Sequence, residues 1–324
     1  MTARFLAVVL LLGLSVLPSS GCVPAEGEAR PGGELTAVPS LTLILAGDVM
    51  LGRGVAQALN GDWKAAFAGV RPWLGAPSSQ PGSGQVLFVA NLESPLTALP
   101  QIKEGYDLRA PPEAVAALRA AGLDALSLAN NHTLDAGEAG LDETADTLRE
   151  AGIVPWMDAA PVAMAGTISV CGLAFDDSAA SLDIDAAAAA IAAAAARAEV
   201  VVVSIHWGGE YQAAPGEHQQ AVARALSEAG ATLIAGHGPH VLQRVEWVGE
   251  TLVAYSLGNF LFDQRYPIDC RWGALLRVTL QGAQIAAVDA VPTVSERGRV
   301  QRADDETAQA IMDRLGLETI KQAE

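Results

Sequence analysis

Cysteine is scarce in this chain of 324 residues, which contains only three. Two of them, Cys171 and Cys270, lie far from the amino terminus and far from each other, so they provide no disulfide framework. The sequence leaves open whether these two form one bridge or remain buried thiols. Because 51% of the residues are apolar, the chain can bury a full hydrophobic core, and its composition argues against global disorder.

Basic residues are the second deficit, since 20 Lys and Arg stand against 37 Asp and Glu and the net charge is −17. This balance argues against nucleic acid as the main partner, because phosphate backbones bind to basic surfaces. A small phosphoester remains compatible with the charge, because a bound metal ion can supply positive charge locally.

Three familiar catalytic signatures are also missing. The sequence has no Gly-x-Ser-x-Gly nucleophile elbow, which argues against a serine hydrolase. It has neither a Walker-type phosphate loop nor a Gly-x-Gly-x-x-Gly dinucleotide fingerprint after a strand. The chemistry must therefore come from another set of side chains.

The first residues are typical of a targeting segment. An apolar run from Phe5 to Leu17 is too short to cross a bilayer comfortably, and small residues then lead to Cys22. This order resembles a bacterial lipoprotein processing site, although Ser19 stands where such sites usually carry Leu. We predict a signal peptide over residues 1–21, lipidation of Cys22 and an extracytoplasmic, membrane-anchored location; an ordinary secretory peptide cut nearby is the alternative. Residues 22–40, rich in Pro, Gly and Glu, are predicted to form a flexible tether.

Apolar runs of strand length alternate with helical stretches in the rest of the chain, which predicts one α/β domain over residues 41–324. The predicted strands are 41–46, 86–90, 125–129, 167–175, 200–205, 232–235, 251–255 and 274–280. The predicted helices are 112–121, 138–151, 185–198, 215–229 and 304–315, with Pro112 and Pro215 in first turns and Gly122, Gly152 and Gly230 beyond the carboxyl ends. The strands from Thr251 onward lack long helices between them, which predicts an antiparallel portion.

Polar residues follow the predicted strands repeatedly. The strand ends carry Asp48, Glu93, Asn130, Asn131, His132, Asp135, His206, Glu210, His237, His240 and Asn259. In open α/β sheets, ligand sites form beyond the carboxyl ends of the strands. Carboxylate, imidazole and amide ligands together suit Mn, Zn or Fe better than Ca or Mg alone. The pattern therefore predicts a site for one or two divalent metal ions, whose identity stays open.

Single residues of this set also have plainer interpretations. Asp48 fits a loop or helix cap, and Glu93 fits an exposed loop. His218 lies within a predicted helix and is expected to face solvent. Two histidines on one turn, His237 and His240, are hard to explain structurally and favour the metal interpretation.

Six short segments of the sequence together indicate a protein family more specifically than any one of them does alone. They are Gly47-Asp48-Val49-Met50-Leu51-Gly52-Arg53, Asn91-Leu92-Glu93, Ala129-Asn130-Asn131-His132-Thr133-Leu134-Asp135, His206-Trp207-Gly208, Gly236-His237-Gly238-Pro239-His240-Val241-Leu242-Gln243 and Tyr255-Ser256-Leu257-Gly258-Asn259-Phe260. In this order they resemble the CapA family of capsule-synthesis proteins, which is associated with poly-γ-glutamate and is similar to calcineurin-like metallophosphoesterases. The resemblance implies a layered α/β/β/α sandwich with mixed sheets.

The resemblance also implies roles for the side chains at the strand ends. The metal ligands would be Asp48, Glu93, Asn131, His206, His237 and His240. His132 would be the catalytic residue that contacts the leaving group. Substrate contact or support of the ligands would fall to Arg53, Asn130, Asp135, Glu210 and Asn259. The chain departs from the pattern at Met50, where phosphoesterases usually carry His, at Glu93, where they carry a bridging Asp, and at Gly238, where CapA proteins usually carry His.

Two functions are compatible with this pattern. The first is a metal-dependent hydrolase of the cell envelope that acts on a phosphoester or an envelope polymer linked to capsule synthesis, with the capsule-synthesis machinery as a partner. The second is a non-catalytic, lipid-anchored factor for polymer binding, assembly or export, with a vestigial metal site. Met50 and Gly238 favour the second, whereas His132, which metal binding alone does not require, favours the first.

Overall fold

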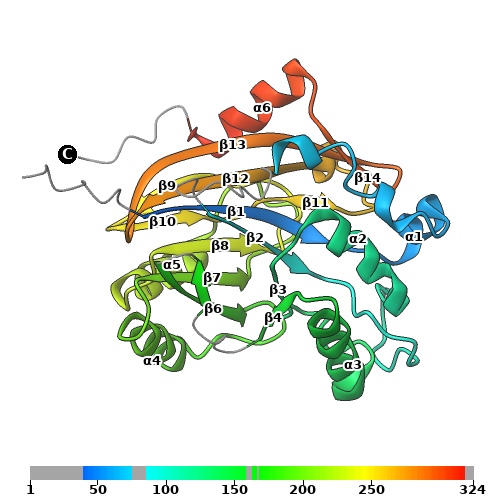
Figure 1. Ribbon diagram of the computed structural model, residues 1–324, viewed down its shortest axis with the longest axis horizontal. Helices are drawn as coiled ribbons and strands as arrows, with labels where there is room; N and C mark the ends of the chain where they lie inside the picture. The colour runs from blue at the N-terminus through cyan, green and yellow to red at the C-terminus, as the bar shows by residue number, and fades with distance from the viewer. Residues whose placement is uncertain (1–38, 75–84, 158–162, 166–167, 318–324) are drawn as a thin grey trace, which may run out of the picture. The chain divides into compact units, whose positions relative to one another are not determined.

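Two mixed β-sheets lie face to face in the computed structural model, which describes residues 39–74, 85–157, 163–165 and 168–317 (Figure 1). The first sheet contains β14 (Arg299–Arg302), β13 (Gln284–Glu296), β12 (Trp272–Gln281), β1 (Ser40–Val49), β2 (Gln85–Leu92), β3 (Ala125–Ser127) and β4 (Val154–Trp156) in this order, with β11 (Asn259–Leu261) also beside β1. The second contains β5 (Ala163–Ala165), β6 (Ile168–Asp176), β7 (Val200–His206), β8 (Leu233–His237), β10 (Thr251–Ala254) and β9 (Val245–Val248).

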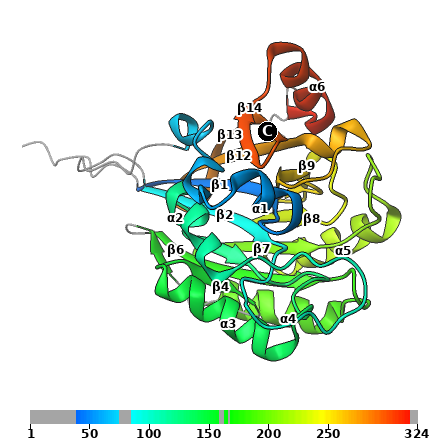
Figure 2. The same ribbon diagram turned by 90° about the vertical axis from the view of Figure 1, so that its right-hand side faces the viewer.

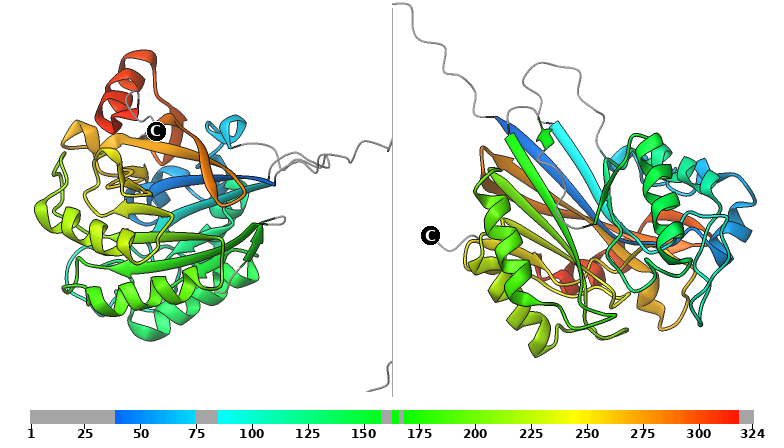
Figure 3. Two further views of the ribbon diagram at one scale, coloured as in Figure 1. Left: turned by 90° about the vertical axis from the view of Figure 1, so that its left-hand side faces the viewer. Right: turned by 90° about the horizontal axis from the view of Figure 1, so that it is seen from below.

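Helices cover the outer face of each sheet. They are α1 (Arg53–Leu59), α2 (Val115–Ala121) and α3 (Gly137–Glu150) on the first sheet, and α4 (Ile184–Ala195) and α5 (Glu217–Glu228) on the second (Figure 3). A further helix, α6 (Asp305–Leu315), packs against β12 and β13. Short 3₁₀ turns occupy Trp63–Ala65, Arg71–Trp73, Pro112–Ala114 and Ile268–Arg271.

The alternation of side chains along the strands explains the layers. In β1, Leu41, Leu43 and Leu45 point into the core between the two sheets, whereas Ile44 packs in the core under α1, α2 and α3. In β7, which is buried along its whole length, alternate valines likewise belong to the core between the sheets and to the core under α4 and α5. The predicted layered α/β/β/α architecture with mixed sheets is confirmed.

Most of the early strands of each sheet pair in parallel, and the last strands of the first sheet form the antiparallel portion that the sequence predicted. Strands β1 to β4 pair in parallel, and so do β6, β7, β8 and β10. Strands β12, β13 and β14 are antiparallel to their neighbours, which confirms the antiparallel portion, although β10 itself is parallel to β8. Gly122, Gly152 and Gly230 follow α2, α3 and α5 with φ values of 81°, 78° and 104°, the left-handed geometry expected after a helix.

A few local predictions need correction. Pro112 begins a 3₁₀ turn ahead of α2, but Pro215 lies before Gly216, the N-cap of α5, and not in the first turn. The helix α1 and the strands β4, β5, β9, β11, β13 and β14 were not predicted. The predicted signal peptide, Cys22 and all but the end of the predicted tether lie outside the described residues, and the domain boundaries stay a prediction.

Candidate metal centre

The strands of both sheets deliver polar side chains to one edge. Strands β1 and β2 of the first sheet and β7 and β8 of the second run toward the right-hand side of Figure 1, and Figure 2 looks onto that side. Asp48 lies near the end of β1, and Glu93 directly follows β2. His206 and His237 are the last residues of β7 and β8, and His240 lies in the loop after β8. All five side chains are buried, so the exposed-loop interpretation of Glu93 is wrong.

Asp48 is surrounded by donors. His237 Nδ1 lies 3.4 Å from one carboxylate oxygen, and His240 Nδ1 lies 3.2 Å from the other. Asn91 Nδ2 donates a hydrogen bond of 2.9 Å to Oδ1, and the amide of Gly238 donates one of 3.3 Å to Oδ2. Burial opposes ionisation of Asp48, but the two neighbouring histidine rings outweigh burial and hold its pKa well below the usual value.

Glu93 faces three imidazole rings. Its Oε1 atom lies 3.6 Å from Nε2 of His206, 3.7 Å from Nε2 of His240 and 4.0 Å from Nε2 of His132. Neither carboxylate oxygen of Glu93 accepts a hydrogen bond from any described residue. A buried carboxylate without donors is costly, so Glu93 has the environment of a ligand to a cation.

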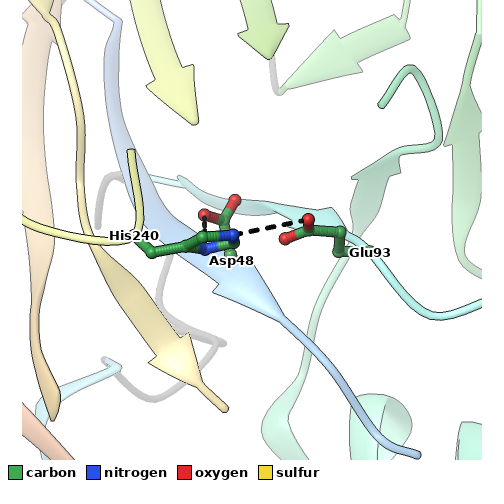
Figure 4. Close-up of side chains that lie close together, drawn as sticks. All are labelled: Asp48, Glu93 and His240. Atoms are coloured by element: carbon green, nitrogen blue, oxygen red, sulfur yellow. Dashed lines mark ion pairs between the residues drawn. The ribbon is translucent and has the colours of Figure 1, made fainter. Parts of the chain in front are cut away.

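The spacing of these buried side chains is compatible with a bound metal ion. One ligand atom each from Asp48, Glu93 and His240 lie within 4.8 Å of one another, with the His240 ring reaching toward both carboxylates (Figure 4). Among the described residues, Nε2 of His206 and Nδ1 of His237 are also buried without a hydrogen-bond partner. Mixed oxygen and imidazole donors suit Zn, Mn or Fe. The residues present therefore fit a divalent cation, without fixing which one.

A tight turn after β3 carries the predicted catalytic histidine. Nδ1 of His132 lies 2.7 Å from the buried Asp135 carboxylate, and its Nε2 is on the side of Glu93. Asn130 stabilises the turn, since its Oδ1 accepts from the His132 amide and its Nδ2 donates to Asn91 Oδ1 and to the carbonyl of β2 residue 92. Asn131 Oδ1 is buried and has no hydrogen-bond partner in the described chain, but no contact joins this side chain to Asp48 or Glu93.

Two polar residues that the sequence analysis missed support the histidines. Ser178 Oγ lies 2.9 Å from His206 Nδ1, and Asp176, at the end of β6, lies 4.0 Å from the same nitrogen. Asp176 and Ser178 could have been found by the pattern that identified the other residues, because Asp176-Asp177-Ser178 is a polar run at the end of a buried strand. Burial would lower the pKa of His206, but the negative charge of Glu93, whose Oε1 lies 3.6 Å from Nε2, outweighs burial and raises it.

His240 is oriented by a separate set of contacts. Asn259 Oδ1 lies 3.0 Å from His240 Nδ1, while Asn259 Nδ2 donates to the Cys270 carbonyl and to Gln264 Oε1. Burial would lower the pKa of His240, but the charge of Glu93 and the hydrogen bond and charge of Asp48 raise it to about 9. His240 is thus cationic at neutral pH in the metal-free protein.

The remaining predicted residues lie at the rim. Arg53 forms an ion pair with Asp263, whose Oδ2 accepts from Arg53 Nε at 3.1 Å, and its guanidinium lies 5.5 Å from the Tyr106 ring. Glu210 is exposed, and no described contact joins it to the buried cluster. The substrate roles of Arg53 and Glu210 stay predictions.

The departures from the family pattern have clear structural positions. Met50 is fully buried in the apolar core under α1, α2 and α3. Gly238 has a φ of 102°, and a Cβ there would lie 2.9 Å from the Trp207 carbonyl oxygen and 3.0 Å from Cε1 of His206. A histidine at position 238 would therefore require the His206 ring or the backbone to move.

The other histidine and the cysteines lie apart from the cluster. His218 is exposed, as expected, and pairs with the buried Asp177 at 2.7 Å. Cys171 and Cys270 are buried thiols that form no disulfide with each other.

Comparison with known proteins places this chain in a family. A family model described as bacterial capsule synthesis protein PGA_cap matches residues 42–156 and 161–264. The chain belongs to this family. Capsule biosynthesis protein CapA of Bacillus anthracis is 30% identical over 328 residues, covering 91% of this chain and 77% of that protein. PGA biosynthesis protein CapA of Bacillus subtilis strain 168 is 30% identical over 252 residues, covering 69% of this chain and 64% of that protein.

Membership of the PGA_cap family confirms the resemblance to CapA proteins seen in the sequence. A crystal structure of a hypothetical protein from Thermus thermophilus aligns with a TM-score of 0.50 at 15% identity, covering 78% of this chain and 98% of that one. This second likeness concerns the fold alone. Across the described residues of this PGA_cap member, every helix lacks the length or the hydrophobicity needed to span a bilayer.

Proposed function

We propose that this PGA_cap protein is a metal-dependent hydrolase that acts in capsule synthesis at the cell envelope. The observation that carries the proposal is the pair formed by His132 and the buried Asp135, with Nδ1 and Oδ2 2.7 Å apart. This pair leaves Nε2 of His132 on the side of Glu93 and the metal-ligand cluster. A carboxylate on Nδ1 fixes the tautomer and orientation of the ring, so that Nε2 is placed to transfer a proton to a leaving group.

The proposed roles follow from the contacts. Asp48, Glu93, His206, His237 and His240 would hold the cation, with Asn131 as a further candidate ligand. A divalent cation in such a site supplies Lewis acidity to a substrate oxygen and lowers the pKa of a coordinated water. His132 would donate a proton to the leaving group through Nε2, while Asp135 fixes the orientation of the ring.

The substrate in this proposal is a phosphoester or a linkage of an envelope polymer. The names of the Bacillus relatives support a place in capsule synthesis, and the capsule-synthesis machinery is the proposed partner. The sequence of the first 22 residues supports export and lipidation of Cys22. Metabolic labelling with a radioactive fatty acid tests the anchor: wild type should be labelled and Cys22→Ser should not, whereas equal labelling rejects it.

Metal analysis and generic hydrolysis test the enzymatic proposal together. The full chain, purified and analysed by mass spectrometry, should contain a stoichiometric divalent metal and cleave bis-p-nitrophenyl phosphate or a related activated ester. His132→Ala should retain the metal and lose turnover, while His218→Ala, which changes an exposed histidine, should behave as wild type. Stoichiometric metal with no turnover on a broad substrate panel would reject the hydrolase.

A second candidate function is a non-catalytic factor for polymer binding, assembly or export. The observation that favours it is Met50, which stands where phosphoesterases carry a histidine ligand and is buried in the apolar core. If this candidate holds, polymer binding persists in His132→Ala and no substrate is turned over. The two candidates therefore differ in the turnover of the wild-type protein, which only the hydrolase shows.

A further inference from the structure

A pocket of about 320 Å³ lies beside the candidate metal centre. It is bounded by α1, by the loop from β11 to β12 and by the turn from β13 to β14, which gather on the side seen in Figure 2. Phe262 and Gln264 line the pocket. The Phe262 ring centroid is 5.0 Å from that of His240, and Gln264 accepts from Asn259, which contacts His240. The pocket and the centre thus share a wall.

Positive charge is concentrated in this pocket, although the chain as a whole is strongly acidic. Arg265, Arg271 and Arg297 all line it. Its two carboxylates are already neutralised, because Asp263 and Glu296 each form an ion pair with an arginine. The side chains of Arg265 and Arg297 are exposed and make no ion pair or hydrogen bond within the described chain. Two unpaired guanidinium groups at one pocket form an attractive field for an anion.

Apolar surface accompanies these charges. Tyr266 is 84% exposed, Ile268 is 54% exposed, and both line the same pocket as Phe262. Guanidinium groups bind carboxylate and phosphate alike in a bidentate manner, so charge alone does not select between them. An inorganic polyphosphate has no apolar part to cover these side chains, whereas a carbon chain that bears carboxylates has one.

We propose that the pocket, termed here the arginine pocket, binds carboxylates of a polyanionic organic chain while a neighbouring linkage of that chain lies at the metal centre. The inference deepens the proposed function and rests on it, because it selects an acidic envelope polymer over a small phosphoester. Arg265 and Arg297 are the residues that confer this specificity. Their guanidinium groups pair with carboxylates, and Tyr266 and Ile268 cover the intervening carbon atoms.

Calorimetric titration of the full chain with a γ-linked hexaglutamate tests the arginine pocket. The double variant R265A/R297A should bind this probe about tenfold more weakly than wild type, since each exposed ion pair contributes modestly. The matched control R119A/R224A removes the same charge from the exposed surfaces of α2 and α5 and should retain wild-type affinity. A hexaglutamine of the same linkage, which lacks the charges, should not bind detectably.

Other results overturn the inference. They are an undetectable affinity of wild type for the hexaglutamate, an equal affinity in the double variant, or an equally tight, arginine-dependent binding of inorganic triphosphate. Circular dichroism checks the fold of each variant, and R265Q/R297Q replaces the alanine variant if that one does not fold. Should the chain hold no metal, the proposed hydrolase fails while hexaglutamate affinity still reports on the pocket. If wild type shows turnover and the double variant binds hexaglutamate as tightly as wild type, the inference about the arginine pocket is rejected and the proposed hydrolase stands.

Discussion

Protons and metal ions are expected to compete for His240. Its pKa in the metal-free protein is raised to about 9, because the charges of Glu93 and Asp48 outweigh the effect of burial. A metal binds only the neutral imidazole, so binding must release this proton. At pH 7 about 1% of the molecules carry the neutral ring, so release of the His240 proton by itself should raise the apparent affinity about tenfold per pH unit up to pH 9.

Chelator-buffered titrations between pH 6.5 and 8.5 measure this effect. With zinc or manganese, wild type should gain at least about a hundredfold in affinity across the interval. His240→Gln should show a shallower dependence, and His218→Ala, which changes an exposed histidine paired with Asp177, should keep the wild-type slope. An affinity that is constant across the interval, or an unchanged slope in His240→Gln, would refute the reasoning.

The stability of the metal-free protein should depend on pH in the opposite direction, because protonated His240 stabilises the folded state. The folded-state pKa of His240 lies above its unfolded value of 6.5, so its contribution is fully present below pH 6.5 and is lost as the pH rises through about 9. The loss amounts to about 3 kcal/mol at most. Asp48, whose pKa is lowered, contributes stability above its unfolded value of 3.8 and stays constant in this window. Urea unfolding of chelator-treated protein should therefore show a decrease in stability with pH, and saturating metal should reverse it.

Three further substitutions probe separate parts of the molecule. Asp135→Asn removes the carboxylate that holds His132, so turnover should fall about 10²- to 10⁴-fold with metal content unchanged; loss of metal instead would assign Asp135 to the ligands. Gly238→Ala should lower the free energy of unfolding by about 1–3 kcal/mol in urea, because φ is 102° and the new Cβ would crowd the Trp207 carbonyl; a neutral effect would contradict this. Leu43→Ala should cost about 2–5 kcal/mol in the same assay, since Leu43 is buried between the sheets, and should leave metal content of the folded protein intact.

Most of the layered fold could be predicted from local sequence. Continuous apolar runs predicted strands such as β7, which is buried on both faces, and glycines marked the ends of α2, α3 and α5. The helix α1 was missed because it has only seven residues, begins after Gly52 and has no capping side chain. β13 was missed because most of its first half is exposed or half-buried, so its position depends on pairing with β12, which is a tertiary property.

The candidate site was predictable for a related reason. Side chains after parallel strands meet at one edge, so Asp48, Glu93, His206 and His237 were identified from their place after apolar runs. Individual contacts were not predictable, because they depend on how two sheets pack. The approach of Ser178 to His206 joins β6 to β7 and was found only in the structure.

The site also explains how two sheets can bury so much charge at their junction. Asp48 and Glu93 come from the first sheet, and His206, His237 and His240 come from the second sheet or the loop after it. Without a cation, two buried carboxylates would repel each other, and the folded state would be destabilised. In the metal-free protein the pKa values of His206 and His240 are raised, which favours the protonated imidazoles as counter-charge to the carboxylates of the other sheet. A divalent cation would replace those protons with the same net effect, so metal binding and the packing of the two sheets are coupled through one set of side chains.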